Sequence, residues 1–72
     1  MDVDPELARR ALQEALQRYP RFETYGPKIV ARPLFKGYAL MLEYAVPPPS
    51  QDSDAWEFQN AAVKEYKKLA GS

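Results

Sequence analysis

The stretch over residues 29–46, IVARPLFKGYALMLEYAV, constrains the fold most, because it is the longest apolar run in the chain. It is rich in β-branched and aromatic residues, and Lys36-Gly37 lies near its middle. That arrangement is typical of two strands joined by a tight turn. We therefore predict a β-hairpin with strands at about residues 28–35 and 38–46.

The hairpin divides into two unequal faces if Phe35 and Tyr38 flank the turn, because opposed residues then share a face. The predicted core face holds Ile29, Ala31, Phe35, Tyr38, Leu40, Leu42, Tyr44 and Val46. The predicted outer face holds Val30, Arg32, Leu34, Ala39, Met41 and Glu43. A type I turn with Gly37 as a bulge would shift the pairing by one and bury Arg32 and Lys28. Burying unpaired cations costs several kcal/mol, so we expect the first register, with Ile29 opposite Tyr44.

Residues 5–19 are predicted to form an amphipathic helix. Asp4 is a good N-cap, Pro5 fits the first helical position, and Pro20 ends the helix. The apolar arc of this helix consists of Leu7, Ala8, Ala11, Leu12, Ala15, Leu16 and Tyr19.

A second helix is predicted at about residues 54–70, after a proline-rich loop at residues 47–53. We expect it to start at Asp54, with Glu57 three residues later completing a capping box. Its inner stripe consists of Ala55, Phe58, Ala62, Tyr66 and Leu69. The prolines favour an ordered extended connection, and a proline-rich ligand segment is the alternative.

The stretch at about residues 21–25 favours a short strand, because Phe22, Thr24 and Tyr25 have high β propensity. With this strand the element order is αβββα, and without it the order is αββα. A third strand would support an isolated hairpin, so we expect three strands. The prediction is one α+β domain of 72 residues, with two helices packed on one face of a small antiparallel sheet.

Composition excludes several classes of function. The chain has no Cys or His, and its ten basic residues balance ten acidic ones. Disulfides, the usual zinc sites, nucleophile–base pairs and glycine-rich phosphate loops are therefore not expected, nor is any cofactor. Neutral charge also argues against nucleic acid as a partner, because no overall field attracts it. No apolar run approaches a membrane span and no signal peptide is evident, so we expect a non-enzymatic protein that is cytoplasmic or recombinant and soluble, with no membrane contact.

The outer hairpin face is the predicted partner-binding site. If both helices cover the other face, Val30, Leu34 and Met41 stay exposed beside Arg32 and Glu43, which we expect to form a surface ion pair. Such an apolar patch suits a protein partner, self-association or strand addition at a free sheet edge. The alternative is that exposed aliphatic residues simply reflect β propensity.

Aromatic residues allow two interpretations. Trp56 either covers the core edge beside Val63 or acts as a partly exposed binding anchor. Among the tyrosines, we expect Tyr38, Tyr44 and Tyr66 in the core and Tyr25 free to face outward.

The segments DPELARRALQEALQRYP, PKIVARPLFKGYALMLEYAVPPP and NAAVKEYKKLAGS resemble those of de novo designed α/β mini-proteins in style. This resemblance spans the chain and implies a stable scaffold or a binder. The stretch SQDSDAWEFQN departs from the charged residues usual in such designs, which suggests contact with a target.

The expected αβββα order is also similar to that of double-stranded RNA-binding domains. The last helix matches that family at Glu57, Asn60, Ala61, Ala62, Lys64 and Glu65. The family binds phosphates with lysines, but the matching positions here are Ala55, Trp56 and Gln59, so those cations are missing.

The function expected from the sequence is therefore a small scaffold or protein-binding domain. The alternative is a degenerate RNA-binding-like module for RNA binding or dimerisation.

Overall fold

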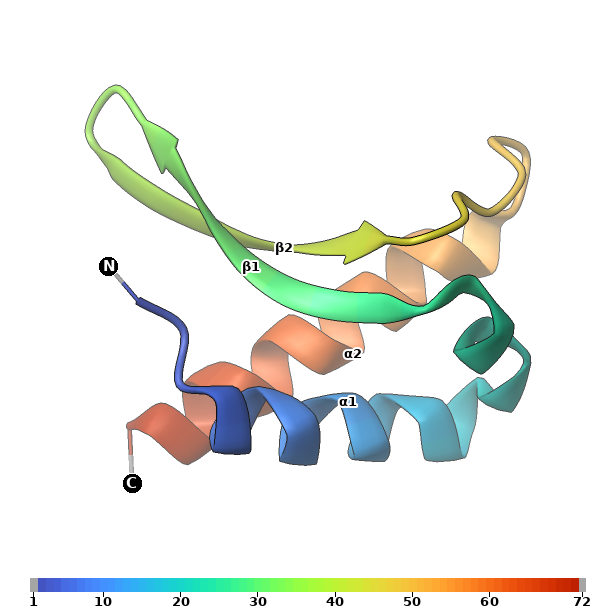
Figure 1. The fold of residues 1–72 in the computed structure, drawn as a ribbon, viewed down its shortest axis with the longest axis horizontal. Coiled ribbons are helices and arrows are strands. Elements are labelled where there is room, and N and C mark those ends of the chain that lie inside the picture. The colour runs from blue at the N-terminus through green and yellow to red at the C-terminus, as the bar shows by residue number, and fades with distance from the viewer. Residues whose placement is uncertain (1, 72) are drawn as a thin grey trace.

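The computed structural model describes residues 2–71 as a two-stranded antiparallel sheet with two helices on one face. The elements in order are α1 (Pro5–Arg18), the 3₁₀ helix η1 (Pro20–Tyr25), β1 (Pro27–Leu34), β2 (Gly37–Tyr44) and α2 (Ser53–Ala70). Figure 1 shows the curved hairpin lying over both helices. The predicted α+β class is confirmed, in its αββα form.

The predicted strand at residues 21–25 is wrong, because this segment forms η1. Phe22 is fully buried and stacks on Phe58 of α2, with ring centroids 4.7 Å apart and planes 10° from parallel. A tight helical turn after Pro20 directs this ring into the core, and burial of a large aromatic side chain outweighs local β propensity. Gly26, which has the left-handed backbone φ of 61°, ends the segment.

Both helices begin at aspartate caps. The Asp4 carboxylate accepts the N–H groups of Glu6 and Leu7, so the predicted cap of α1 is confirmed. The predicted cap of α2 is wrong, because Asp52 caps it and Asp54 lies inside the first turn. Arg21 binds Asp52 with two hydrogen bonds of 2.6 and 2.7 Å, which fixes the earlier start.

The strand register differs by two residues from the expected one. Ile29 lies opposite Leu42, and Leu34 lies opposite Gly37, so Phe35 and Lys36 form the turn. A shift of two residues keeps every side chain on its own face, so the predicted division into faces holds although the pairing was wrong. The two turn residues keep negative φ, and Gly37 has the positive φ of 120°.

The core lies between the two helices and the half of the hairpin that adjoins η1. Its buried members are Ala8, Ala11, Ala15, Phe22, Ile29, Leu42, Phe58, Ala62 and Tyr66. Three predicted core residues (Phe35, Tyr38 and Val46) are exposed, because the turn and the distal hairpin extend beyond the helices and Val46 follows the end of β2. Tyr25 was expected to face outward, but it packs edge to face against Tyr44.

The buried hydroxyl of Tyr44 gives a testable prediction about stability. Its hydroxyl is buried with no hydrogen-bond partner among residues 2–71, and burial, followed by the charge of Asp52, raises its pKa. Tyr44→Phe is expected to stabilise the fold by about 1 kcal/mol, because an unpaired buried hydroxyl carries an uncompensated desolvation penalty. Urea denaturation measures the change.

Tyr66→Phe is the matched control, because the Tyr66 hydroxyl accepts the backbone N–H of Asp4 at 3.0 Å. This variant should lose about 1 kcal/mol. Equal losses for the two variants would show that the Tyr44 hydroxyl has a partner in solution.

Candidate functional site

The outer face of the hairpin carries most of the predicted site. Val30 and Met41 lie opposite each other at mid-strand and are half-buried. Arg32 and Glu43 lie on either side of this pair in the register, and their expected ion pair, which is present, spans it. The mid-strand surface is therefore a small apolar pair with a charged bridge across it.

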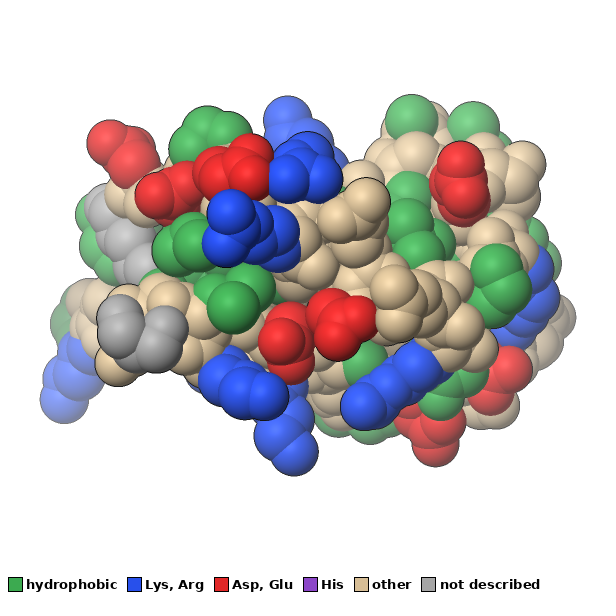
Figure 2. Space-filling model, turned by 90° about the horizontal axis from the view of Figure 1, so that it is seen from below, with side chains coloured by type: hydrophobic (Ala, Val, Ile, Leu, Met, Phe, Trp, Pro, Cys, Tyr) green, Lys and Arg blue, Asp and Glu red, His purple; other side chains and the backbone are tan. Residues whose placement is uncertain are grey.

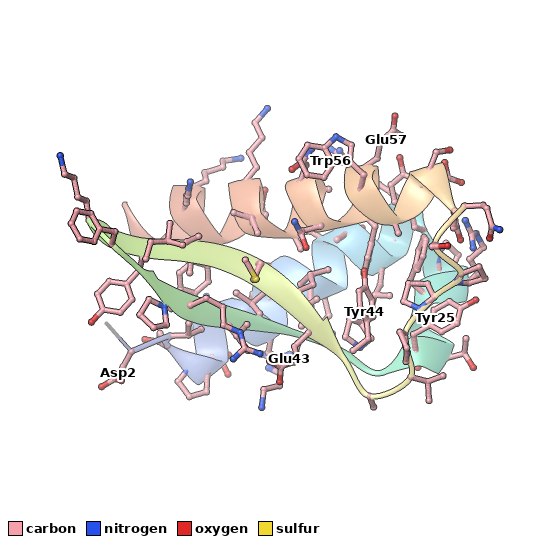
Figure 3. All side chains as sticks on the ribbon, turned by 90° about the horizontal axis from the view of Figure 1, so that it is seen from above. Asp2, Tyr25, Glu43, Tyr44, Trp56 and Glu57 are labelled. Atoms are coloured by element: carbon pink, nitrogen blue, oxygen red, sulfur yellow. The ribbon has the colours of Figure 1, made fainter. Side chains whose placement is uncertain are left out.

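Trp56 is not part of that surface. It lies on α2 and is 66% exposed, so the interpretation that it covers the core edge is wrong. In Figure 3, Trp56 and Glu43 lie at opposite sides of the molecule. The helix places Trp56 apart from the hairpin residues with which sequence reasoning grouped it.

Among residues 2–71, three of the five exposed large apolar side chains lie at the end of the hairpin. Phe35 is 98% exposed, Leu34 58% and Tyr38 53%, and we name these three residues the apolar tip. Figure 1 shows the hairpin end projecting past the helices. Sequence reasoning found Leu34 but placed Phe35 and Tyr38 in the core.

Element lengths alone carry only part of the signal for this overhang. The 14 residues of α1 rise about 21 Å, whereas the 8 residues of each strand extend about 27 Å. The 18 residues of α2, however, rise about 27 Å, which equals the strands. The exposure of the residues around the turn therefore depends on where the helices lie under the hairpin.

The free edge of β1 is blocked at both ends by prolines. Ala45 donates its N–H to Gly26, and alternate residues from Gly26 onward therefore face β2. Pro27 and Pro33 face the free edge together with Ile29 and Ala31, and at the two prolines the missing N–H costs nothing. Only Ile29 and Ala31 are left to present N–H donors there, which leaves room for only a short added strand.

The free edge of β2 is occupied at its centre. The N–H of Leu42 points away from β1 and donates to the side-chain oxygen of Gln59 on α2 at 3.2 Å. An incoming strand would have to displace this bond. The predicted strand addition therefore has limited access at both edges.

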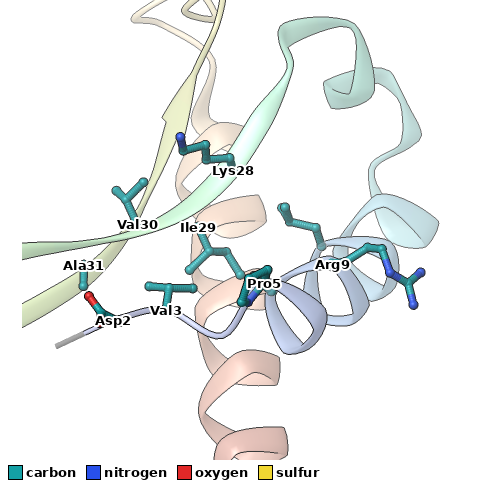
Figure 4. A pocket seen from close by; sticks show the side chains of 10 residues that line it. Asp2, Val3, Pro5, Arg9, Lys28, Ile29, Val30 and Ala31 are labelled. Atoms are coloured by element: carbon teal, nitrogen blue, oxygen red, sulfur yellow. The ribbon is translucent and has the colours of Figure 1, made fainter.

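A groove of about 630 Å³ lies between β1, the start of α1 and the segment before it. Figure 4 shows Val3 and Ile29 close together inside it, with Asp2 near Ala31. Its lining residues are Asp2, Val3, Pro5, Ala8, Arg9, Leu12, Lys28, Ile29, Val30 and Ala31. The groove is mainly apolar and lies on the free side of β1.

The charged residues away from the hairpin link structural elements. Arg21 joins η1 to the start of α2 through Asp52 and Asp54. The Arg21 hydrogen bonds hold the pKa of Asp52 below its usual range and raise that of Arg21. A hydrogen bond to Glu57, at 2.9 Å, raises the pKa of the Tyr19 hydroxyl. These contacts connect the elements to one another and give each of these charged side chains a structural role.

Figure 2 shows acidic and basic side chains interspersed over the helix face. Within residues 2–71, no three side chains of the metal-ligating types form a group suited to an ion. Across the same residues, no helix has the length and apolar character needed to span a membrane. No protein-family model matches the chain, and comparisons with curated proteins and with solved structures found no match.

Proposed function

We propose that this chain is a non-enzymatic domain that binds another protein through the apolar tip and the adjoining outer face of the hairpin. The observation that carries the proposal is the exposure of Leu34, Phe35 and Tyr38 around the end of a projecting arm, with Leu34 on its outer face and Tyr38 on the opposite one. A group of large exposed apolar side chains often marks a surface that meets a partner. Aromatic side chains are also enriched where protein partners meet.

The outer face supplies a suitable border for this contact. Val30 and Met41 continue the apolar surface from the tip toward mid-strand, and the Arg32–Glu43 ion pair crosses it. Charged pairs at the rim of an interface add orientation and selectivity more than affinity. Trp56 remains a separate candidate contact on α2.

The double-stranded RNA-binding alternative has less support. The sheet has two strands where the family has three, so the shared element order no longer holds. Phosphate recognition depends on clustered cations, whereas the charges on the helix face are mixed. A scaffold that binds nothing would leave the exposed tip unexplained.

The test is a selection of binding peptides from a displayed random library. Leu34→Glu is the informative variant and Val46→Glu its control, because the two aliphatic side chains are 58% and 57% exposed. Peptides selected on the native chain should bind Leu34→Glu at least about tenfold more weakly and bind Val46→Glu unchanged. Both variants should keep their stability to within about 0.5 kcal/mol.

Surface plasmon resonance measures the affinities, and urea denaturation measures the stability. The proposal is wrong if the selected peptides bind all three proteins equally. It is also wrong if repeated selection yields no peptide that binds.

A further inference from the structure

We propose that the partner is a second copy of this chain, with the apolar tip of each copy inserted into the groove beside β1 of the other. This inference rests on the proposed function, because it uses the same tip. It adds the identity of the partner and the surface that receives the tip.

The exposed area of the chain fits the requirement of a small dimer. The chain exposes 5146 Å², whereas a compact monomer of its mass, 8.2 kDa, exposes about 4,500 Å². The excess is about 600 Å² per copy. Stable protein interfaces take about 600–1,000 Å² from each partner, so two copies that bury their excess reach the lower end of that range.

The positions of tip and groove allow a closed pair. The groove contains the segment before α1, and Figure 1 shows this segment at the same end of the molecule as the hairpin turn. A two-fold axis at that end would bring each tip to the other copy's groove. The pair would then contain two equivalent contacts, and both tips and both grooves would be buried. Edge-to-edge strand pairing, which Pro27 and Pro33 restrict, is not needed for this contact.

The groove is lined by one carboxylate, Asp2, and by two cations, Arg9, which pairs with Glu6, and Lys28. Lys36 lies in the turn between Phe35 and Gly37. Within residues 2–71, neither Lys36 nor Asp2 forms an ion pair. These charges would orient an inserted tip so that Lys36 of one copy lies beside Asp2 of the other and away from Lys28. The net charge of zero adds no repulsion between copies.

The first experiment measures the mass of the full chain by sedimentation equilibrium from about 10 μM to about 1 mM. The mass should rise with concentration from 8.2 kDa toward twice that value. Phe35→Glu should weaken the dimer at least about 30-fold, because each dimer loses two central aromatic contacts. Val46→Glu, which changes an exposed residue beyond the other end of β2, should dimerise like the native chain.

The second experiment identifies the receiving surface. In a mixture of isotope-labelled and unlabelled chains, filtered NOE spectra should show contacts from the Phe35 ring of one copy to the methyl groups of Val3 and Ala31 of the other. Contacts to α2 instead would overturn the groove as the receiving surface.

The outcomes separate this inference from the function on which it rests. A chain that stays monomeric to about 1 mM while library peptides still bind its tip overturns the second copy as partner and leaves protein binding intact. Equal dimerisation by the native chain, Phe35→Glu and Val46→Glu overturns the tip as the contact. If Leu34→Glu also binds the peptides unchanged, the proposed function fails with it.

Discussion

Phe22→Ala is expected to lower the free energy of unfolding by about 3–5 kcal/mol. Phe22 is fully buried, stacks on Phe58 and meets Tyr19 edge to face, with ring centroids 6.2 Å apart. Removing the ring leaves a cavity between α1, α2 and η1, and these elements cannot all move to fill it. A chain of 72 residues has about 4–11 kcal/mol in total, so the variant should be partly unfolded at 37 °C.

Phe35→Ala makes the same chemical change where the ring is 98% exposed. Its stability should remain within about 0.5 kcal/mol of the native value. Urea denaturation followed by circular dichroism compares the two variants. Similar losses for both would mean that the Phe35 ring is packed and that the hairpin end does not project into solvent.

Local chemistry determines the parts of this fold that were predictable from sequence. The cap at Asp4, Pro5 in the first turn and the apolar arc of α1 all act within a few residues of each other, and α1 ends within one residue of its predicted limit. The two faces of the hairpin were also predictable, because alternation depends only on parity along each strand. The αββα arrangement follows from three amphipathic surfaces that must share one core.

The wrong predictions concern features that neither the alternation of side chains along a strand nor local secondary-structure propensity determines. The pairing of Ile29 with Leu42 depends on which two residues make the turn, and parity alone cannot choose between registers two apart. The placement of Phe22 depends on Phe58, a partner far away in the chain. For this reason a segment with β propensity became η1.

The candidate site was only partly predictable for the same reason. Val30, Arg32, Leu34, Met41 and Glu43 do share the outer face, because that face follows from alternation. The exposure of Phe35 and Tyr38 depends on where the two helices lie under the hairpin, which is a tertiary property. Trp56 lies apart, because its position depends on how α2 is rotated against the sheet.

Ala11→Leu is expected to destabilise the fold by about 1–3 kcal/mol, although it adds apolar surface. Ala11 on α1 and Ala62 on α2 are both fully buried, and Ala8 and Ala15 extend the small-residue surface of α1. The larger side chain would have to separate α1 from α2 or adopt a strained rotamer. Urea denaturation measures the loss.

Ala70→Leu is the control, because Ala70 is an exposed residue in the last turn of α2. It should stay within about 0.5 kcal/mol of the native chain. An Ala11→Leu variant as stable as this control would show that the helix interface has spare volume. The hairpin tip is remote from this interface, so dimerisation of Ala11→Leu should fall only in proportion to its folded fraction. Phe35→Glu should show the opposite pattern, with native stability and a weakened dimer, which separates the residues that maintain the fold from those that bind.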